Sequence, residues 1–129
     1  MREILFRGER VDNGEWVYGA FVPDLREVYF GDEIDGFIKP FGKTKEERLM
    51  VEVDRKTVGQ YTGLTDKNGV KIFEGDILRG KPGNFTVRWS ESICSFVAGK
   101  DTKMLPCMNV GTMKHLEVIG NIYDNPELQ

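Results

Sequence analysis

Hydrophobic and polar positions alternate along this chain over short stretches, and turn-forming residues separate the stretches. Alternation with little helical periodicity is typical of β-strands. The pattern predicts strands over residues 4–7, 16–21, 28–30, 37–38, 49–53, 58–62, 71–73, 76–79, 85–89, 93–97, 104–108 and 116–123. The sequence therefore predicts an all-β fold.

Turn residues and proline set the limits of these strands. The Asp-Asn-Gly sequence at residues 12–14 predicts a tight turn and a first hairpin, because Asn and Gly tolerate a positive φ. The Asn-Gly pair at residues 68–69 is the strongest hairpin signal in the chain. Pro106 lacks the N–H that a central strand needs, so we expect strand 104–108 at an edge. The lysine-rich segment 41–48 is expected to be a mobile loop or a hairpin tip.

The length of 129 residues fits one domain. At this size about two-thirds of the surface of the unfolded chain is buried on folding, enough for a core without disulfides or metals. We expect a single domain over residues 1–129, with a subdivision into 1–55 and 56–129. The second part is predicted to form an SH3-like small barrel, with the N-terminal hairpin region packed on it.

Composition excludes some functions and disfavours others. The chain is 40% hydrophobic and 30% charged, as soluble globular proteins are. Its net charge of −3 and isoelectric point of about 5.3 argue against nucleic-acid binding, which usually uses a basic face. We expect that the charged N-terminus is not a signal peptide, and no run approaches the ~20 apolar residues of a membrane helix. The expected location is the cytoplasm, without membrane contact.

Residue types that carry catalysis or bind metals are few. Cys94 and Cys107 form no CxxC pair, and we expect both to be small, buried, reduced residues. His115, the single histidine, is predicted on a loop before the last strand, outside any catalytic motif. Asp66 could open a calcium loop, but Ile77 stands where the bidentate glutamate would be needed. We therefore expect no catalytic residues, no metal and no cofactor.

Two carboxylates, Glu74 and Asp76, flank Gly75. Paired carboxylates can act as acid and base when burial raises the pKa of one of them. The simpler interpretation is a turn, in which Gly75 adopts a positive φ, Asp76 accepts hydrogen bonds from nearby backbone N–H groups, and Glu74 is solvated. Both interpretations stay open at the level of sequence.

Large aromatic residues are expected in the core, because they dominate the cores of small β proteins. The residues in question are Trp16, Tyr18, Tyr61, Phe73, Trp89 and Tyr123. The alternative is a shallow aromatic groove of the kind that SH3-like barrels use for peptides.

Three segments carry a resemblance to a known family. They are residues 1–7 with 16–19, residues 58–69 with 72–77, and residues 117–128. In order and content they resemble the YopX proteins of phages and prophages. The resemblance spans nearly the whole chain, whereas residues 24–50 and 90–115 match nothing in it. It implies a small β-rich accessory protein inside a bacterial host, and it transfers no activity and no catalytic residue.

The favoured function is a non-enzymatic binding or interaction module for an unknown protein partner. Binding would use an exposed strand edge, or an aromatic-lined groove beside the hairpin formed by strands 58–62 and 71–73, which is called the signature hairpin. The expected binding residues are Tyr61, Asp66, Asn68, Phe73, Glu74 and Asp76.

Three alternatives stay open. The first is a nucleic-acid-binding small β-barrel, which the acidic isoelectric point disfavours. The second is a structural protein that assembles into a homo-oligomer through exposed strand edges. The third is an enzyme that combines Glu74 or Asp76 with His115.

Overall fold

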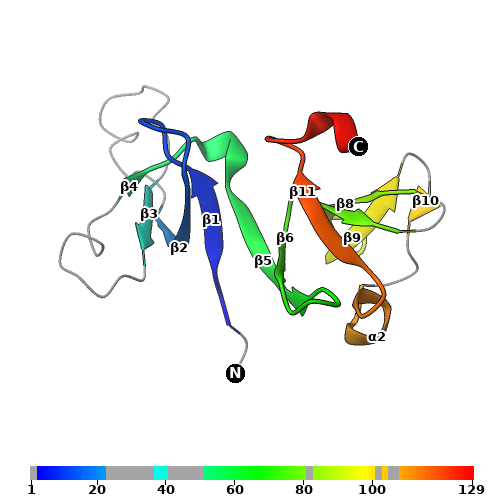
Figure 1. The fold of residues 1–129 in the computed structure, drawn as a ribbon. Coiled ribbons are helices and arrows are strands. Elements are labelled where there is room, and N and C mark those ends of the chain that lie inside the picture. The colour runs from blue at the N-terminus through cyan, green and yellow to red at the C-terminus, as the bar shows by residue number, and fades with distance from the viewer. Residues whose placement is uncertain (1–2, 23–36, 41–50, 81–82, 101–102, 105–107) are drawn as a thin grey trace. The chain divides into compact units, whose positions relative to one another are not determined.

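The computed structural model describes residues 3–22, 37–40, 51–80, 83–100, 103–104 and 108–129 (Figure 1). The chain folds as two compact units, Met1–Gln60 and Tyr61–Gln129. The described strands are β1 (Phe6–Glu9), β2 (Trp16–Val22), β3 (Phe37–Pro40), β4 (Val51–Glu52), β5 (Gly59–Thr65), β6 (Lys71–Phe73), β7 (Asp76–Arg79), β8 (Phe85–Ser90), β9 (Ser95–Lys100), β10 (Lys103–Met104) and β11 (Glu117–Asn121). The described helical segments are η2 (Arg55–Thr57), α2 (Val110–Met113) and η3 (Pro126–Leu128). The predicted all-β class is confirmed.

The first unit is an antiparallel sheet with the strand order β4-β3-β2-β1, extended by the start of β5. The predicted first hairpin is present, with Phe6 opposite Gly19 and Glu9 opposite Trp16. Its turn closes with a hydrogen bond of 2.9 Å from the Gly14 N–H to the Arg10 carbonyl. Gly14 has a φ of +73°, the conformation for which glycine was expected there.

The second unit contains the β5–β6 hairpin and an antiparallel sheet with the order β10-β9-β8-β7-β11. Strand β10 lies at one edge of this sheet and covers only the first position of the predicted strand 104–108; residues 105–107, with Pro106, lie outside the described residues. Strand β11 pairs with β7 at the opposite edge, and their register shifts between Val118 and Gly120. A side chain at Gly120 would meet Asn125, because a Cβ there would lie 2.5 Å from the Asn125 Oδ1.

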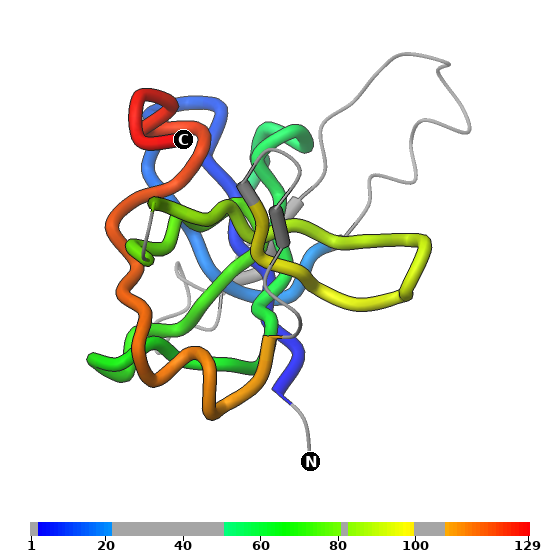
Figure 2. Tube along the Cα trace, turned by 90° about the vertical axis from the view of Figure 1, so that its right-hand side faces the viewer, coloured from blue at the N-terminus to red at the C-terminus, as the bar shows by residue number. Residues whose placement is uncertain are grey.

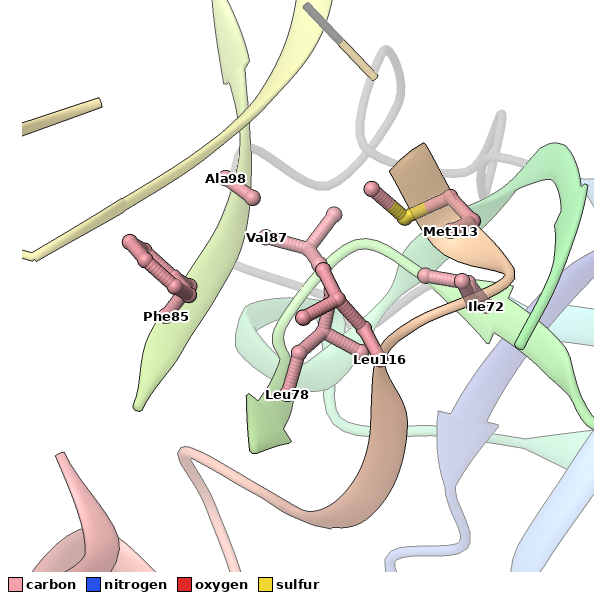
Figure 3. Packing of buried hydrophobic residues seen from close by; sticks show 7 residues of the cluster. All are labelled: Ile72, Leu78, Phe85, Val87, Ala98, Met113 and Leu116. Carbon is pink, nitrogen blue, oxygen red and sulfur yellow. The ribbon is translucent and has the colours of Figure 1, made fainter. Parts of the chain in front are cut away.

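The core of the second unit lies between β6, β7, β8, β9 and the segment from α2 to β11. Its buried members are Ile72, Leu78, Phe85, Val87, Ala98, Met113 and Leu116 (Figure 3). On β8, alternation correctly predicted that Phe85 and Val87 are buried and that Arg88 is exposed, whereas Trp89, which alternation places on the buried face, is exposed. Each large side chain of this kind stabilises the fold by about 1.5–3 kcal/mol through removal from water.

The β8–β9 hairpin differs from its prediction. Strand β9 begins at Ser95 rather than at Ile93, because residues 91–94 form the turn. Figure 2 shows the hairpin as a long arm that ends in this turn. Cys94 is exposed and has a φ of +52°, in the left-handed region. The prediction that Cys94 is buried is therefore wrong, and Cys107 lies outside the described residues.

Several aromatic side chains are more exposed than predicted. Tyr18, Trp89 and Tyr123 are exposed, and Trp16 is half-buried beneath the Arg7 guanidinium, whose Cζ lies 4.8 Å from the ring centroid. Exposed aromatics remain compatible with a stable β-sheet because a ring can cover its neighbours while one face stays wet. The core prediction is wrong for Tyr18, Trp89 and Tyr123, whereas Trp16 is partly buried.

Other predictions fall outside the description or stay untested. Strand 28–30 and loop 41–48 lie outside the described residues. The single domain, its subdivision at residues 55 and 56, and the SH3-like barrel with the N-terminal region packed on it remain predictions. In the described part of the chain, no helix has the length and apolar character to span a membrane.

Candidate functional site

The tip of the β5–β6 hairpin is organised by the carboxylate of Asp66, which is 5% exposed. Its Oδ1 accepts hydrogen bonds from the N–H groups of Asn68 (2.8 Å) and Val70 (2.9 Å). Its Oδ2 accepts a third bond, of 2.9 Å, from the N–H of Val118 at the start of β11. The turn itself closes between the Asp66 carbonyl and Gly69, whose φ is +80°. The Asn-Gly signal therefore marked a real hairpin.

The surroundings of Asp66 keep it ionised. Burial alone raises the pKa of this carboxyl, but the hydrogen bonds from Val118, Val70 and Asn68 and the charge of Lys67 outweigh it. The net result is a pKa below the ordinary value of 3.8. A carboxylate held in this way is a weak base and a strong structural acceptor.

The Glu74-Gly75-Asp76 segment has the geometry of the turn interpretation. Asp76 is 2% exposed, and its Oδ2 accepts a hydrogen bond of 2.8 Å from the Phe73 N–H. Gly75 has a φ of +93°, and its N–H donates to the Val87 carbonyl at 2.8 Å. Glu74 is half-buried. The turn therefore connects β6 to β7 and ties both to β8.

The two aromatic residues of the signature are core residues. Tyr61 is 8% exposed and Phe73 is 3% exposed, and their ring centroids lie 5.6 Å apart. The Lys71 Nζ lies 5.4 Å from the centroid of the Tyr61 ring. Neither ring is among the described lining residues of the pockets beside the hairpin tip, and the aromatic groove remains a prediction.

A pocket of about 590 Å³ lies beside the tip of the same hairpin. All of its described lining residues belong to the second unit. Its lining residues come from the hairpin tip, the end of β7, the start of β8, α2 and the start of β11: Lys67, Arg79, Gly80, Phe85, Thr112, His115, Leu116 and Glu117.

Three charged side chains line this pocket and lie close to one another. The Lys67 Nζ and the Arg79 Nη1 each lie 3.8 Å from the Glu117 Oε2. Pairing of β7 with β11 places Arg79 directly opposite Glu117, and the hairpin tip supplies Lys67. All three side chains are at least one-third exposed, so the two ion pairs contribute little to stability.

The apolar part of the pocket is continuous with the core. Phe85 and Leu116 line the pocket and also belong to the buried cluster. Gly80 brings the backbone close to the Phe85 ring: a Cβ at this position would lie 2.7 Å from the Phe85 Cδ2. The absence of a side chain at Gly80 therefore gives the ring its room.

A short capped helix positions the remaining lining residues. The Asn109 Oδ1 accepts a hydrogen bond of 2.9 Å from the Thr112 N–H, and the Thr112 Oγ1 accepts one of 3.1 Å from the Asn109 N–H. This reciprocal cap holds α2 and, directly after it, the exposed His115. Among the described residues, no group of three His, Cys, Asp or Glu side chains is arranged to hold a metal ion.

A smaller hollow of about 290 Å³ shares Lys67 with the first pocket. Its lining residues come from the end of β5, the hairpin tip and the α2 segment: Gly63, Leu64, Thr65, Asp66, Lys67, Val110 and Lys114. Lys67 therefore lies between two depressions, and the carboxylate network of Asp66 fixes its backbone position.

Comparison with known proteins agrees with the signature segments. The family described as "YopX protein" matches residues 6–129. The chain belongs to the YopX family. This YopX chain is also similar to a solved structure, the crystal structure of protein EF1440 from Enterococcus faecalis. The two are 23% identical with a TM-score of 0.62, and the match covers 99% of each chain. At that identity the likeness concerns the fold alone. No curated protein matches the chain.

Sequence reasoning identified the hairpin of this YopX protein but missed the pocket beside it. Of the six predicted binding residues, Tyr61, Phe73, Asp66 and Asp76 are buried, Glu74 is half-buried and Asn68 is exposed at the tip. The described pocket residues come from four separate stretches of the chain, 67, 79–80, 85 and 112–117, so no local motif could identify them together. The one local signal was the Asn-x-x-Thr spacing of the helix cap at residues 109–112.

Proposed function

We propose that this YopX protein is a non-enzymatic binding module that takes a segment of a partner protein in the 590 Å³ pocket. The observation that carries the proposal is the pocket itself, in which an apolar surface meets a few charged groups. Ligand sites in proteins are typically concave and mostly apolar, with a small number of polar groups that orient the ligand. We further propose that the protein acts in the cytoplasm of a bacterium that carries a phage or prophage.

The proposal moves recognition from the aromatic residues of the hairpin to its tip. Tyr61 and Phe73 serve the core, whereas Lys67 is exposed and reaches the pocket. The signature hairpin then has two roles, because it closes the fold through Asp66 and presents Lys67 beside the ligand site.

An enzymatic role has weaker support. The buried carboxylates of Asp66 and Asp76 both accept hydrogen bonds from backbone N–H groups. For Asp66 the lowered pKa makes the group a poor general base at neutral pH. These contacts favour structural roles for both side chains.

Nucleic-acid binding is also less well supported. A nucleic-acid site neutralises several phosphates with Lys and Arg, and its affinity falls steeply with salt. Here Glu117 stands between the two cations of the pocket, and the chain carries a net charge of −3. A negative side chain in the centre of the site opposes a polyanion.

The proposal is tested by site-specific photo-crosslinking in host lysate. A photoreactive amino acid replaces the exposed His115 in the pocket, and a matched control places it at the exposed Glu91 in the β8–β9 turn. Nuclease treatment of one half of each sample distinguishes protein from nucleic-acid adducts.

Support requires one discrete protein adduct at position 115 that is absent at position 91 and is lost when Lys67 and Arg79 are both changed to Glu. The captured protein must then bind the unmodified YopX protein in purified form. Adducts that are the same at both positions, or an adduct that nuclease removes, would overturn the proposal.

A further inference from the structure

We infer that the pocket recognises a peptide carboxylate that lies next to an apolar side chain. The inference rests on the proposed function, since it names the chemistry of the partner segment that the pocket would take. Lys67 and Arg79 would bind the carboxylate, and Glu117 is the internal group with which that carboxylate competes.

The contacts with Glu117 do not use all the N–H donors of Lys67 and Arg79. Charge-assisted N–H···O bonds have donor–acceptor distances of about 2.7–2.9 Å. Both cations stand 3.8 Å from the Glu117 Oε2, beyond that range. Within the described ranges, Glu117 is the carboxylate paired with Lys67 and with Arg79. A guanidinium can bind a carboxylate through two parallel N–H bonds, which the present arrangement of Arg79 and Glu117 does not use.

The count of charges points to one negative group on the ligand. Among the side chains that line the pocket, Lys67 and Arg79 carry two positive charges and Glu117 carries one negative charge, which leaves one positive charge unbalanced. The ionised Asp66 lies outside this lining, where three backbone N–H groups already donate to its carboxylate. A single carboxylate neutralises that excess. A ligand with several phosphates would place further negative charges against Glu117 and against a chain that is acidic as a whole.

The apolar surface next to the cations defines the second half of the ligand. Phe85 and Leu116 line the pocket, and the absence of a side chain at Gly80 leaves room for the Phe85 ring. Burial of an aliphatic or aromatic side chain against this surface would add a favourable hydrophobic contribution. The combination of one anion and one neighbouring apolar group distinguishes a peptide from an inorganic anion.

The ligand carboxylate has two sources in a protein, an acidic side chain or the C-terminus. Three short peptides separate these sources in a titration followed by the backbone amide signals of the protein. Acetyl-Ala-Leu with a free C-terminal carboxylate tests the terminus, acetyl-Leu-Asp-amide tests the side chain, and acetyl-Leu-Asn-amide is the neutral control. We expect one or both charged peptides to shift the amide signals of residues 67, 79 and 115–117. The neutral peptide should bind about tenfold or more weakly, since it lacks the charged acceptor.

Two variants test the roles of the charged groups. Arg79→Gln should weaken binding of the charged peptide about tenfold. Glu117→Gln should strengthen it by about two- to fivefold, because it removes the competing carboxylate and keeps the shape of the side chain. Arg88→Gln, an exposed cation on β8 outside the pocket lining, is the matched control and should leave the affinity unchanged.

Equal binding of neutral and charged peptides, no binding of either charged peptide, or weaker binding by the Glu117→Gln variant would overturn the inference. None of these results bears on whether a protein crosslinks at position 115, so the proposed function is judged separately. Conversely, a charged peptide that binds as expected, with no protein adduct at position 115, would support this ligand chemistry and count against a protein partner.

Discussion

The Asp66 carboxylate accepts a hydrogen bond from the backbone N–H of Val118, 2.9 Å away and 52 residues later in the chain. One turn residue thereby joins the tip of the β5–β6 hairpin to the beginning of the last strand. The neighbouring Lys67 N–H donates to the Leu116 carbonyl at 3.0 Å, which makes the junction a pair of bonds rather than one. The placement of Lys67 beside the pocket depends on this junction.

Asp66→Ala should destabilise the second unit by on the order of 3 kcal/mol, because it leaves three backbone N–H groups without their acceptor. Asp66→Asn keeps the size of the side chain and one acceptor oxygen, so it should cost less. Urea unfolding followed by circular dichroism measures both. The control is Asp12→Asn at an exposed turn, for which we expect a much smaller change; equal effects at the two sites would contradict the structural role of Asp66.

The stability that Asp66 contributes should decrease when the pH is lowered into the acidic range. Its pKa is lower in the folded protein than the ordinary value of 3.8, so its contribution is fully present above that value. The contribution is lost as the pH falls through the lowered pKa of the folded state. We therefore expect the difference in unfolding free energy between the natural protein and Asp66→Asn to be constant from about pH 5 to 7 and to shrink below about pH 4. A difference that grows on acidification would show that the pKa is raised instead.

Gly80→Ala should destabilise the protein by about 1–3 kcal/mol, because the new methyl group overlaps the Phe85 ring. Phe85→Leu alone should also destabilise, through the loss of buried aromatic surface. The double variant should be more stable than the sum of the two changes predicts, since the smaller leucine leaves room for the methyl group. Chemical unfolding of the four proteins gives the coupling energy, and strict additivity would mean that the ring is not in the way.

Cys94→Asn should stabilise the protein by up to about 1 kcal/mol. Cys94 has a φ of +52°, and Asn tolerates this left-handed conformation better than most residues. Cys94→Val should have the opposite effect, because a β-branched side chain is strained there. Thermal unfolding under reducing conditions compares the three proteins without interference from oxidation, and a stabilising valine would refute the argument from backbone conformation.

The strands could be predicted because their information is local. Alternating side chains marked β8, and the Asn-Gly signal at residues 68–69 marked the β5–β6 hairpin. Gly75 could be read as a turn residue because its positive φ is a property of glycine itself. These features depend on neighbours within a few positions of the chain.

The pocket could not be predicted because its information is not local. Arg79 meets Glu117 only through the pairing of β7 with β11, and Lys67 joins them only through the Asp66 junction. Cys94 shows a second limit, because small apolar residues are usually buried whereas this one occupies a turn. Both the grouping of the pocket residues and the exposure of Cys94 depend on the three-dimensional fold rather than on neighbours in the sequence.

At the start of β11, the backbone is hydrogen-bonded to the hairpin of its own chain. The Leu116 carbonyl and the Val118 N–H, which point away from β7, are bound by Lys67 and Asp66. An incoming strand from another molecule would first have to displace a buried carboxylate and break both bonds. The signature hairpin therefore also blocks part of a strand edge at which other molecules could otherwise pair and form fibrous aggregates.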